Sequence, residues 1–253
     1  MLDQLLDVKY LYLILIIWLV GSAELGFRIG QRHRKHQYRP EDLGTLTAST
    51  LGLLALLLAF SLSHALSRYE ARRALVLEEA NAIESTANLA LMLPMKAQAP
   101  ILSALRDYVA VRIGLGTPYD PAKMDRDVAK SRNLLTMLWQ QAAAVSEPQS
   151  LPAHRFINSL DEMTKIQEGR LTSLRYYVPN AVLLMLLGVA TVAIGLTGYQ
   201  SGLTQTRLQM GTVALAITIA IVMVLVIDID QPARGFILVP AQALMDVAKG
   251  IPP

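Results

Sequence analysis

The sequence predicts an all-α integral membrane protein with four transmembrane helices and a helical extramembrane domain between the second and the third. Of its 253 residues, 53% are hydrophobic and only 17% are charged, which is too apolar for an ordinary soluble domain. The apolar residues are concentrated in windows without Asp, Glu, Lys or Arg, namely 43–67, 176–206 and 208–227. Each window is long enough to cross a hydrocarbon core of about 30 Å as a helix. No sustained alternation typical of strands occurs.

The first transmembrane hairpin is expected over residues 1–67, with spans at about 10–27 and 43–67. Glu24 is the one charged residue that interrupts the first of these spans. It precedes Arg28 by four residues, a spacing that places both side chains on one helix face. We expect an ion pair between them near the membrane surface.

The extramembrane domain is expected over residues 68–175. Residues 68–93 contain no Gly or Pro and are rich in helix-forming residues, so the second span is predicted to continue out of the membrane as one helix. Pro94 and Pro100 are expected to break it. Three more helices are predicted, at about 101–115, at 121–145 with Asp120 as N-cap and Pro121 at the first helical position, and at 153–177, leading directly into the third span.

The second transmembrane hairpin is expected over residues 176–229, with spans at about 178–198 and 210–228. The C-terminal segment, 230–253, is expected to lie along the membrane interface as a half-buried helix. Basic residues cluster in the loop 28–42 between the first two spans, which places this loop in the cytoplasm by the positive-inside rule. Arg68, Arg72 and Arg73, just beyond the second span, weigh against that orientation.

A polar stripe follows one face of the second span. Steps of three and four residues select the candidate pore-lining residues Thr47, Thr50, Leu54, Leu57, Ser61, His64 and Arg68. Around a common axis in an oligomer, they would form a polar vestibule, a leucine constriction that gates by dewetting, and a second vestibule ending in a basic ring. The alternative is that the hydroxyl groups bond back to their own helix or help the spans to pack.

The fourth span ends in the stretch VIDIDQPARGFI, in which two carboxylates are separated by one residue. On a helix, Asp228 and Asp230 point about 200° apart, so they converge on one cation only where the chain has unwound, as Pro232 favours. Carboxylates at a helix C-terminus need partners against the helix dipole. We interpret Asp228, Asp230 and Arg234 as a structural latch, with a cation site as the alternative.

Sites for catalysis, metals and nucleic acids are not indicated. The chain has no cysteine, and none of its four histidines lies beside a nucleophile in a recognised motif. The acidic run EEANAIE lacks the histidine spacing of a di-iron bundle. The basic residues flank membrane spans instead of forming a nucleic-acid surface. No catalytic residue, metal site or cofactor is therefore expected, and the chain is not expected to be an enzyme.

Two segments, SRYEARRALVLEEANAIESTA (67–87) and DIDQPARGFI (228–237), resemble hallmark segments of the bacterial bestrophin-like family. The resemblance extends over most of the chain, in the order two spans, helical middle, two spans and acidic exit. It implies a multi-pass protein of the bacterial inner membrane that forms a homo-oligomer, with a pentamer as the candidate form. It also implies an ion channel whose second span lines the pore.

Ion conduction is thus the expected activity, with the lipid bilayer, ions and further copies of the chain as partners. The competing hypothesis is a non-conducting sensor or scaffold that uses its helical domain to bind a ligand or a partner.

Overall fold

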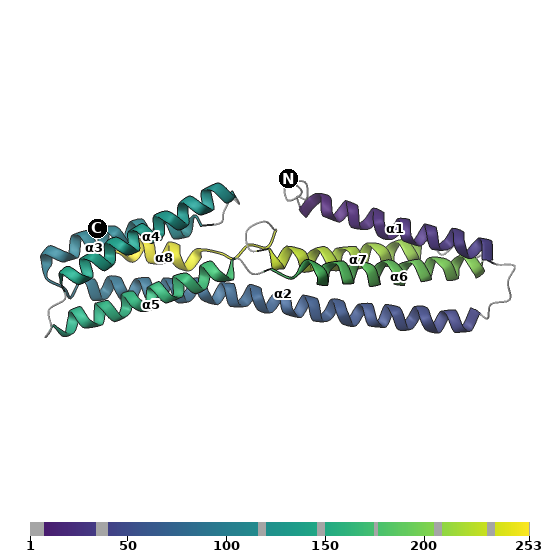
Figure 1. Ribbon diagram of the computed structural model, residues 1–253, viewed down its shortest axis with the longest axis horizontal. Coiled ribbons are helices and arrows are strands. Elements are labelled where there is room, and N and C mark those ends of the chain that lie inside the picture. The colour runs from purple at the N-terminus through teal and green to yellow at the C-terminus, as the bar shows by residue number, and fades with distance from the viewer. Residues whose placement is uncertain are drawn as a thin grey trace. The chain divides into compact units, whose positions relative to one another are not determined.

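The computed structural model describes residues 8–33, 40–115, 120–145, 150–174, 177–204, 209–231 and 236–252, and all regular structure in these ranges is helical (Figure 1). In chain order the helices are α1 (Val8–His33), α2 (Pro40–Ala90), α3 (Met95–Ile113), α4 (Pro121–Ala144), α5 (Leu151–Ser173), α6 (Asn180–Thr204), α7 (Gln209–Asp230) and α8 (Gln242–Gly250). The predicted all-α class is confirmed.

The chain divides into two compact units. The membrane unit comprises Met1–Ser67, Tyr177–Gln231 and Gly235–Ile237, and the domain comprises Arg68–Tyr176, Pro232–Arg234 and Leu238–Pro253. Helices long and apolar enough to cross a membrane are found at Tyr10–His33, Leu43–Ala90, Asn180–Thr204 and Met210–Asp230. About 20 apolar residues suffice to cross a bilayer, so the uncharged part of α2, 43–67, is long enough to serve as its membrane span. The four predicted spans are confirmed.

In the membrane unit, α1 and α6 approach so closely that only glycine fits at their contact. A Cβ added to Gly26 would lie 2.1 Å from the carbonyl oxygen of Gly195, and one added to Gly198 would lie 2.1 Å from that of Ala23. Small residues spaced in this way are typical of membrane helix pairs, where packing replaces the hydrophobic effect. Figure 1 shows α7 beside this pair, and its Ala216 and Ala220 are fully buried in the same core.

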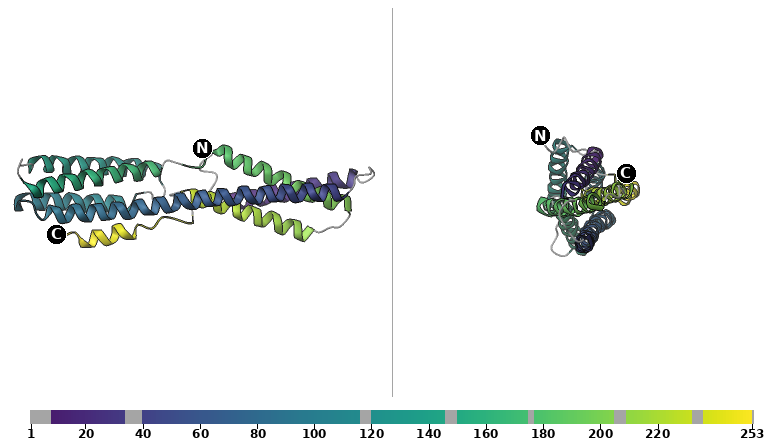
Figure 2. Two further views of the ribbon diagram at one scale, coloured as in Figure 1. Left: turned by 90° about the horizontal axis from the view of Figure 1, so that it is seen from below. Right: turned by 90° about the vertical axis from the view of Figure 1, so that its right-hand side faces the viewer.

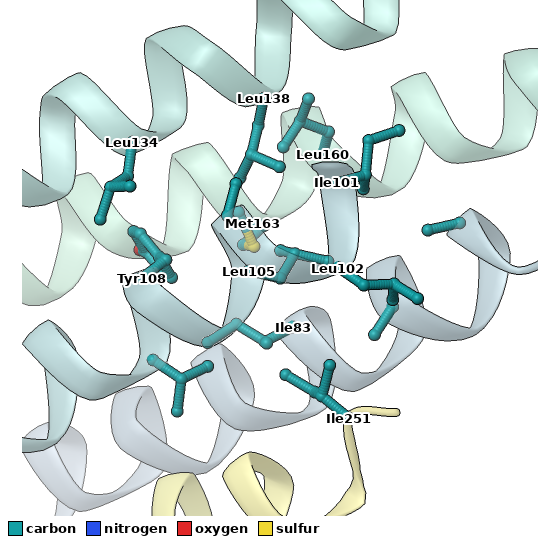
Figure 3. Packing of buried hydrophobic residues seen from close by; sticks show 14 of the residues in the cluster. Ile83, Ile101, Leu102, Leu105, Tyr108, Leu134, Leu138, Leu160, Met163 and Ile251 are labelled. Atoms are coloured by element: carbon teal, nitrogen blue, oxygen red, sulfur yellow. The ribbon is translucent and has the colours of Figure 1, made fainter. Parts of the chain in front are cut away.

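The domain packs α3, α4 and α5 around the second half of α2 (Figure 2). Its core is a contiguous cluster of apolar side chains, several of them completely buried, including Ile83, Leu105, Tyr108, Leu138 and Met163 (Figure 3). Side-chain hydrogen bonds also connect the helices of the domain. The hydroxyls of Thr86 and Ser159 lie 2.8 Å apart between α2 and α5.

Helix α3 begins at Met95, six residues before the predicted start, and contains Pro100 within its second turn. Proline at this position removes one backbone hydrogen bond, to the carbonyl of Lys96. Both Pro100 and Lys96 are exposed, so water can satisfy that carbonyl. The helix therefore tolerates a residue that the sequence pattern treats as a break.

Helix α5 does not lead directly into the third span. It ends at Ser173, and residues 177–179 are non-helical before α6 begins at Asn180. Pro179 explains the difference, because a proline disfavours helical geometry in the residue before it. Of the two helices predicted to continue into membrane spans, only α2 does so among the described residues.

The C-terminal segment packs with the domain, and its placement along a membrane interface stays a prediction. Helix α8 packs against α3, and Leu244 and Ile251 are buried in the domain core. These two apolar side chains of the segment are thus covered by protein.

Candidate functional site

The predicted pore stripe lies largely on the inner side of α2. Thr47 and Leu54 are only 6% and 1% exposed, and Leu54 belongs to the apolar core of the membrane unit. A side chain buried against its own subunit does not face an axis shared by several subunits. The structure thus places these two residues in the packing of the bundle, and whether the predicted stripe lines a pore stays a prediction.

The rest of the predicted stripe turns gradually away from the core. Thr50, Leu57 and Ser61 are half-buried, His64 is exposed, and Arg68 is half-buried with an interaction partner. The hydroxyls of Thr47, Thr50 and Ser61 each donate to the backbone carbonyl four residues earlier, at 2.8 Å. These three hydroxyls follow the alternative considered for the sequence, in which they bond back to their own helix.

The opposite side of α2 carries a second polar stripe, which we call the exposed face. Leu56 lies about 200° around the helix from Leu54 and is 53% exposed. The residues that share its side of the helix all are exposed and follow one another at steps of three or four: Thr45, Ser49, Gly52, Leu56, Ala59, Ser63 and Ser67. Hydroxyl groups therefore lie toward both ends of this face, with Leu56 between them.

The two carboxylates at the end of α7 bind backbone amides. Asp228 accepts hydrogen bonds from the backbone N–H of Phe236, at 2.9 and 3.1 Å to its two oxygens, and from that of Ile237 at 3.1 Å. Asp230 accepts one from the backbone N–H of Val178 at 2.7 Å. They are only 2% and 5% exposed, and hydrogen bonds to a buried carboxylate are among the strongest in proteins.

These bonds join the end of the fourth span to the chain that follows it and to the residues that precede the third span. This geometry favours a structural latch in which both carboxylates bind backbone amides. Arg234 lies outside the described residues. Within the described ranges, no group of three or more His, Cys, Asp or Glu residues is placed to hold a metal ion.

The expected ion pair of the first span is present. The Nε atom of Arg28 lies 2.8 Å from a carboxylate oxygen of Glu24, and both side chains are substantially exposed. A pair in this setting contributes little to stability.

The domain contains a buried charge cluster that the sequence analysis missed. One oxygen of Glu79 accepts a 2.6 Å hydrogen bond from Nε of Arg112 and a 3.0 Å bond from the hydroxyl of Tyr108. The other oxygen accepts a bond from Arg170. Glu79 and Arg112 are 0% exposed. Helices α2, α3 and α5 thus meet at one carboxylate.

The protonation states in this cluster follow from its geometry. Burial raises the pKa of Glu79, but the charges and hydrogen bonds of Arg112 and Arg170 outweigh burial and hold the pKa below its ordinary value. Burial and then the charge of Glu79 raise the pKa of Tyr108 well above its ordinary value. Burial lowers the pKa of Arg170, and Glu79 partly offsets this. Glu79 is therefore ionised and Tyr108 neutral near pH 7.

A signal for this cluster does exist in the sequence. Leu105, Tyr108, Val109 and Arg112 follow the three-and-four spacing of one helix face, so an arginine occupies a position of the buried stripe. A charged residue in such a stripe predicts a buried partner, because burying an unpaired charge is costly. The pattern does not identify which carboxylate is the partner.

Comparisons with known proteins agree with this fold. The family model of the bestrophin-like domain matches residues 13–244. Crystal structures of a bacterial bestrophin homologue from Klebsiella pneumoniae are similar. One single-substitution variant has a TM-score of 0.68 at 15% identity, covering 95% of this chain and 98% of that one. The structure from zinc phasing has a TM-score of 0.65 at 16% identity, covering 97% and 100%.

A further crystal structure, of a variant membrane protein, has a TM-score of 0.69 at 18% identity and covers 93% of this chain and 97% of that one. No curated protein matches the sequence. The solved structures support the fold, and the family model spans far more than half of the residues. The chain therefore belongs to the bestrophin-like family of membrane proteins.

Proposed function

We propose that this chain is one subunit of a homo-oligomeric ion channel of the bacterial inner membrane, and that the exposed face of α2 lines its pore. The observation that carries the proposal is the distribution of polar groups on α2. Its buried side packs in the bundle, whereas its exposed side places hydroxyls toward both ends and Leu56 in the middle. A helix surface that faces lipid alone has no need for hydroxyls in this pattern.

The proposed pore has the features expected from the sequence, namely two polar vestibules and a leucine constriction between them. These features lie on the opposite face of α2. Ser49 on one side of Leu56 and Ser63 on the other would line the two polar vestibules, and a ring of Leu56 side chains would form a constriction that gates by dewetting. The bestrophin-like membership of the chain supports this proposal, since the family resemblance implies a channel whose second span lines the pore.

Recordings from purified protein in planar bilayers test the proposal with a pair of variants. Leu56→Ser is expected to raise the open fraction, because a polar ring holds water where a leucine ring expels it. Leu54→Ala is expected to lower the stability by about 2–5 kcal/mol, through a cavity in the bundle, with little effect on gating.

Two outcomes would count against the proposal. If gating responds to Leu54→Ala and not to Leu56→Ser, the face of α2 that carries Leu54 lines the pore, as the sequence first predicted. A wild-type protein that conducts no current in any of the salts and at any pH tested would contradict the channel function.

A non-conducting sensor or scaffold is the second candidate, and one feature favours it. The domain has a groove of about 510 Å³ between α2 and the C-terminal segment, lined by Glu70, Arg73, Ala74, Val76, Leu77, Pro240, Gln242 and Ala243. Such a groove could receive part of a ligand or a partner protein. Silent bilayers together with ligand-dependent stabilisation of the domain would support this candidate.

A further inference from the structure

The guanidinium of Arg112 lacks the hydrogen-bond partners that a buried cation needs. Its side chain is 0% exposed, and Nε donates to Glu79. The two terminal nitrogens, Nη1 and Nη2, have no acceptor in the part of the chain that the structure describes. Buried polar groups in folded proteins are nearly always hydrogen-bonded, so two orphaned donors on one buried cation point to a missing partner.

The charges of the cluster do not balance. Arg112 and Arg170 both pair with the single carboxylate of Glu79, which leaves one excess positive charge in the core of the domain. Glu78, Asp107 and Glu168, the acidic residues nearest in sequence to Glu79, Tyr108 and Arg170, are exposed. An unbalanced buried charge costs several kcal/mol. A water molecule could accept the free N–H groups, but it would leave the charge uncompensated.

We propose that Arg112 binds one monovalent anion of halide size, such as chloride, through Nη1 and Nη2. A guanidinium donates in its own plane, and Glu79 already occupies the Nε side, which leaves the terminal nitrogens for a second anion. The guanidinium carbon lies 5.8 Å from the centroid of the Tyr108 ring, so the ring covers a face of the cation and not the edge that carries its donors.

The surroundings limit the ligand to a small one. Arg112 and Tyr108 are completely buried, and the apolar side chains around Tyr108 are closely packed (Figure 3). A dense interior of this kind leaves no space for a nucleotide or a carboxylate metabolite.

Gln167 is a candidate second donor to the anion. It lies one turn before Arg170 on α5, is 2% exposed, and its Oε1 atom has no partner among the described residues. A side-chain amide that turns over about its last bond offers two N–H donors in place of the oxygen. Gln167 would then also have a partner.

Thermal unfolding of the full-length protein in detergent tests the site directly. Chloride is titrated from about 1 to 300 mM against sodium gluconate, with the ionic strength held constant so that general screening does not change. The Tm of the wild type is expected to rise saturably, by about 3–5 °C once chloride is tenfold above its dissociation constant. Bromide is expected to act in the same way.

Arg112→Met removes both the excess charge and the free donors, so its Tm is expected to be independent of the halide. The matched control is Arg126→Met in the same domain, because the side chain of Arg126 is 72% exposed and pairs only loosely with Asp120. The control is expected to keep the full halide response. A halide response that survives in Arg112→Met would overturn the proposal.

Crystals of the wild type grown in sodium bromide test whether Arg112 binds an anion, even if Arg112→Met does not fold. An anomalous bromine peak within hydrogen-bonding reach of Nη1 and Nη2 is the expected result. An ordered water only, or no density there, contradicts the proposal. The site does not depend on conduction, so a silent channel with a bromide peak at Arg112 would leave it intact.

Discussion

Glu79 connects three helices of the domain, because its carboxylate accepts hydrogen bonds from both Arg112 and Arg170. Glu79→Gln keeps the shape and removes the charge, which leaves two buried cations without a counter-charge. The free energy of unfolding is expected to fall by about 3–5 kcal/mol. Tryptophan fluorescence during thermal unfolding would measure the loss.

The neighbouring residue provides the control. Glu78 is exposed, so Glu78→Gln is expected to change the stability by less than about 0.5 kcal/mol. Equal effects of the two substitutions would contradict a special role for the buried cluster.

The pH dependence of stability follows from the same carboxyl group. The pKa of Glu79 in the folded protein lies below its ordinary value of 4.5, so the unfolded chain binds the proton more readily than the folded one. The stabilisation is therefore complete above about pH 4.5 and is lost as the pH falls through the lower, folded pKa. The difference in Tm between wild type and Glu79→Gln is expected to shrink in acid, and a difference that grows there would contradict this assignment.

Asp228 allows a test of the latch at the end of the fourth span. Asp228→Asn leaves one acceptor oxygen for the amides of Phe236 and Ile237, so at least one buried bond is weakened or lost. The expected cost is about 1–3 kcal/mol, together with weaker assembly on size-exclusion chromatography. Asp246→Asn is the control, with no effect expected, because the side chain of Asp246 is exposed on α8. Unchanged stability with an altered response to added calcium would favour a cation site instead.

At the residue scale, local spacing predicts some interactions and not others. The Glu24–Arg28 pair is confirmed because both residues lie on one helix turn. The N-cap of α4 is likewise confirmed, with the Asp120 side chain accepting from the amide of Ala122. Glu79 and Arg170 are 91 positions apart. No local pattern determines such a pairing, since it depends on how separate helices pack.

At the scale of elements, the contact between α1 and α6 depends on missing side chains. In Gly198→Ala the new methyl group would lie 2.1 Å from a backbone carbonyl, so the two helices would have to separate. We expect large destabilisation or failure to fold. Gly188→Ala, on the same helix, meets no atom within 4 Å and is expected to be neutral or slightly stabilising. Folded yield and Tm in detergent measure both, and equal tolerance would contradict the close contact.

Helix positions are predictable from the sequence to different degrees. The four spans follow from hydrophobicity and length, which act locally. The start of α3 does not follow from the sequence, because Pro100 is tolerated on an exposed turn of the helix. The break between α5 and α6 does not follow either, because Pro179 interrupts a pattern that is otherwise typical of a helix. Which side of α2 is buried depends on the placement of α1, α6 and α7. Leu54 and Leu56 cannot be distinguished without that packing.

At the scale of the whole molecule, the proposed channel requires an assembly of subunits around an axis. Electron microscopy of purified particles is expected to show a ring in which α2 lies closest to the centre, because only then do the exposed faces surround one pore. A monomer, or a closed dimer without a central axis for conduction, would contradict the proposed pore.

The absence of cysteine from the chain permits the most direct test of the pore. Single cysteines are placed at Ser49, Leu56 and Ser63 on the exposed face, at Leu54 in the bundle, and at Leu184, which is 66% exposed on α6. A charged, water-soluble methanethiosulfonate reagent is then applied during bilayer recordings.

We expect the reagent to alter the current in Ser49→Cys, Leu56→Cys and Ser63→Cys and to leave the current in Leu54→Cys and Leu184→Cys unchanged. Modification of Leu54→Cys with no response at the exposed face would contradict the proposed pore.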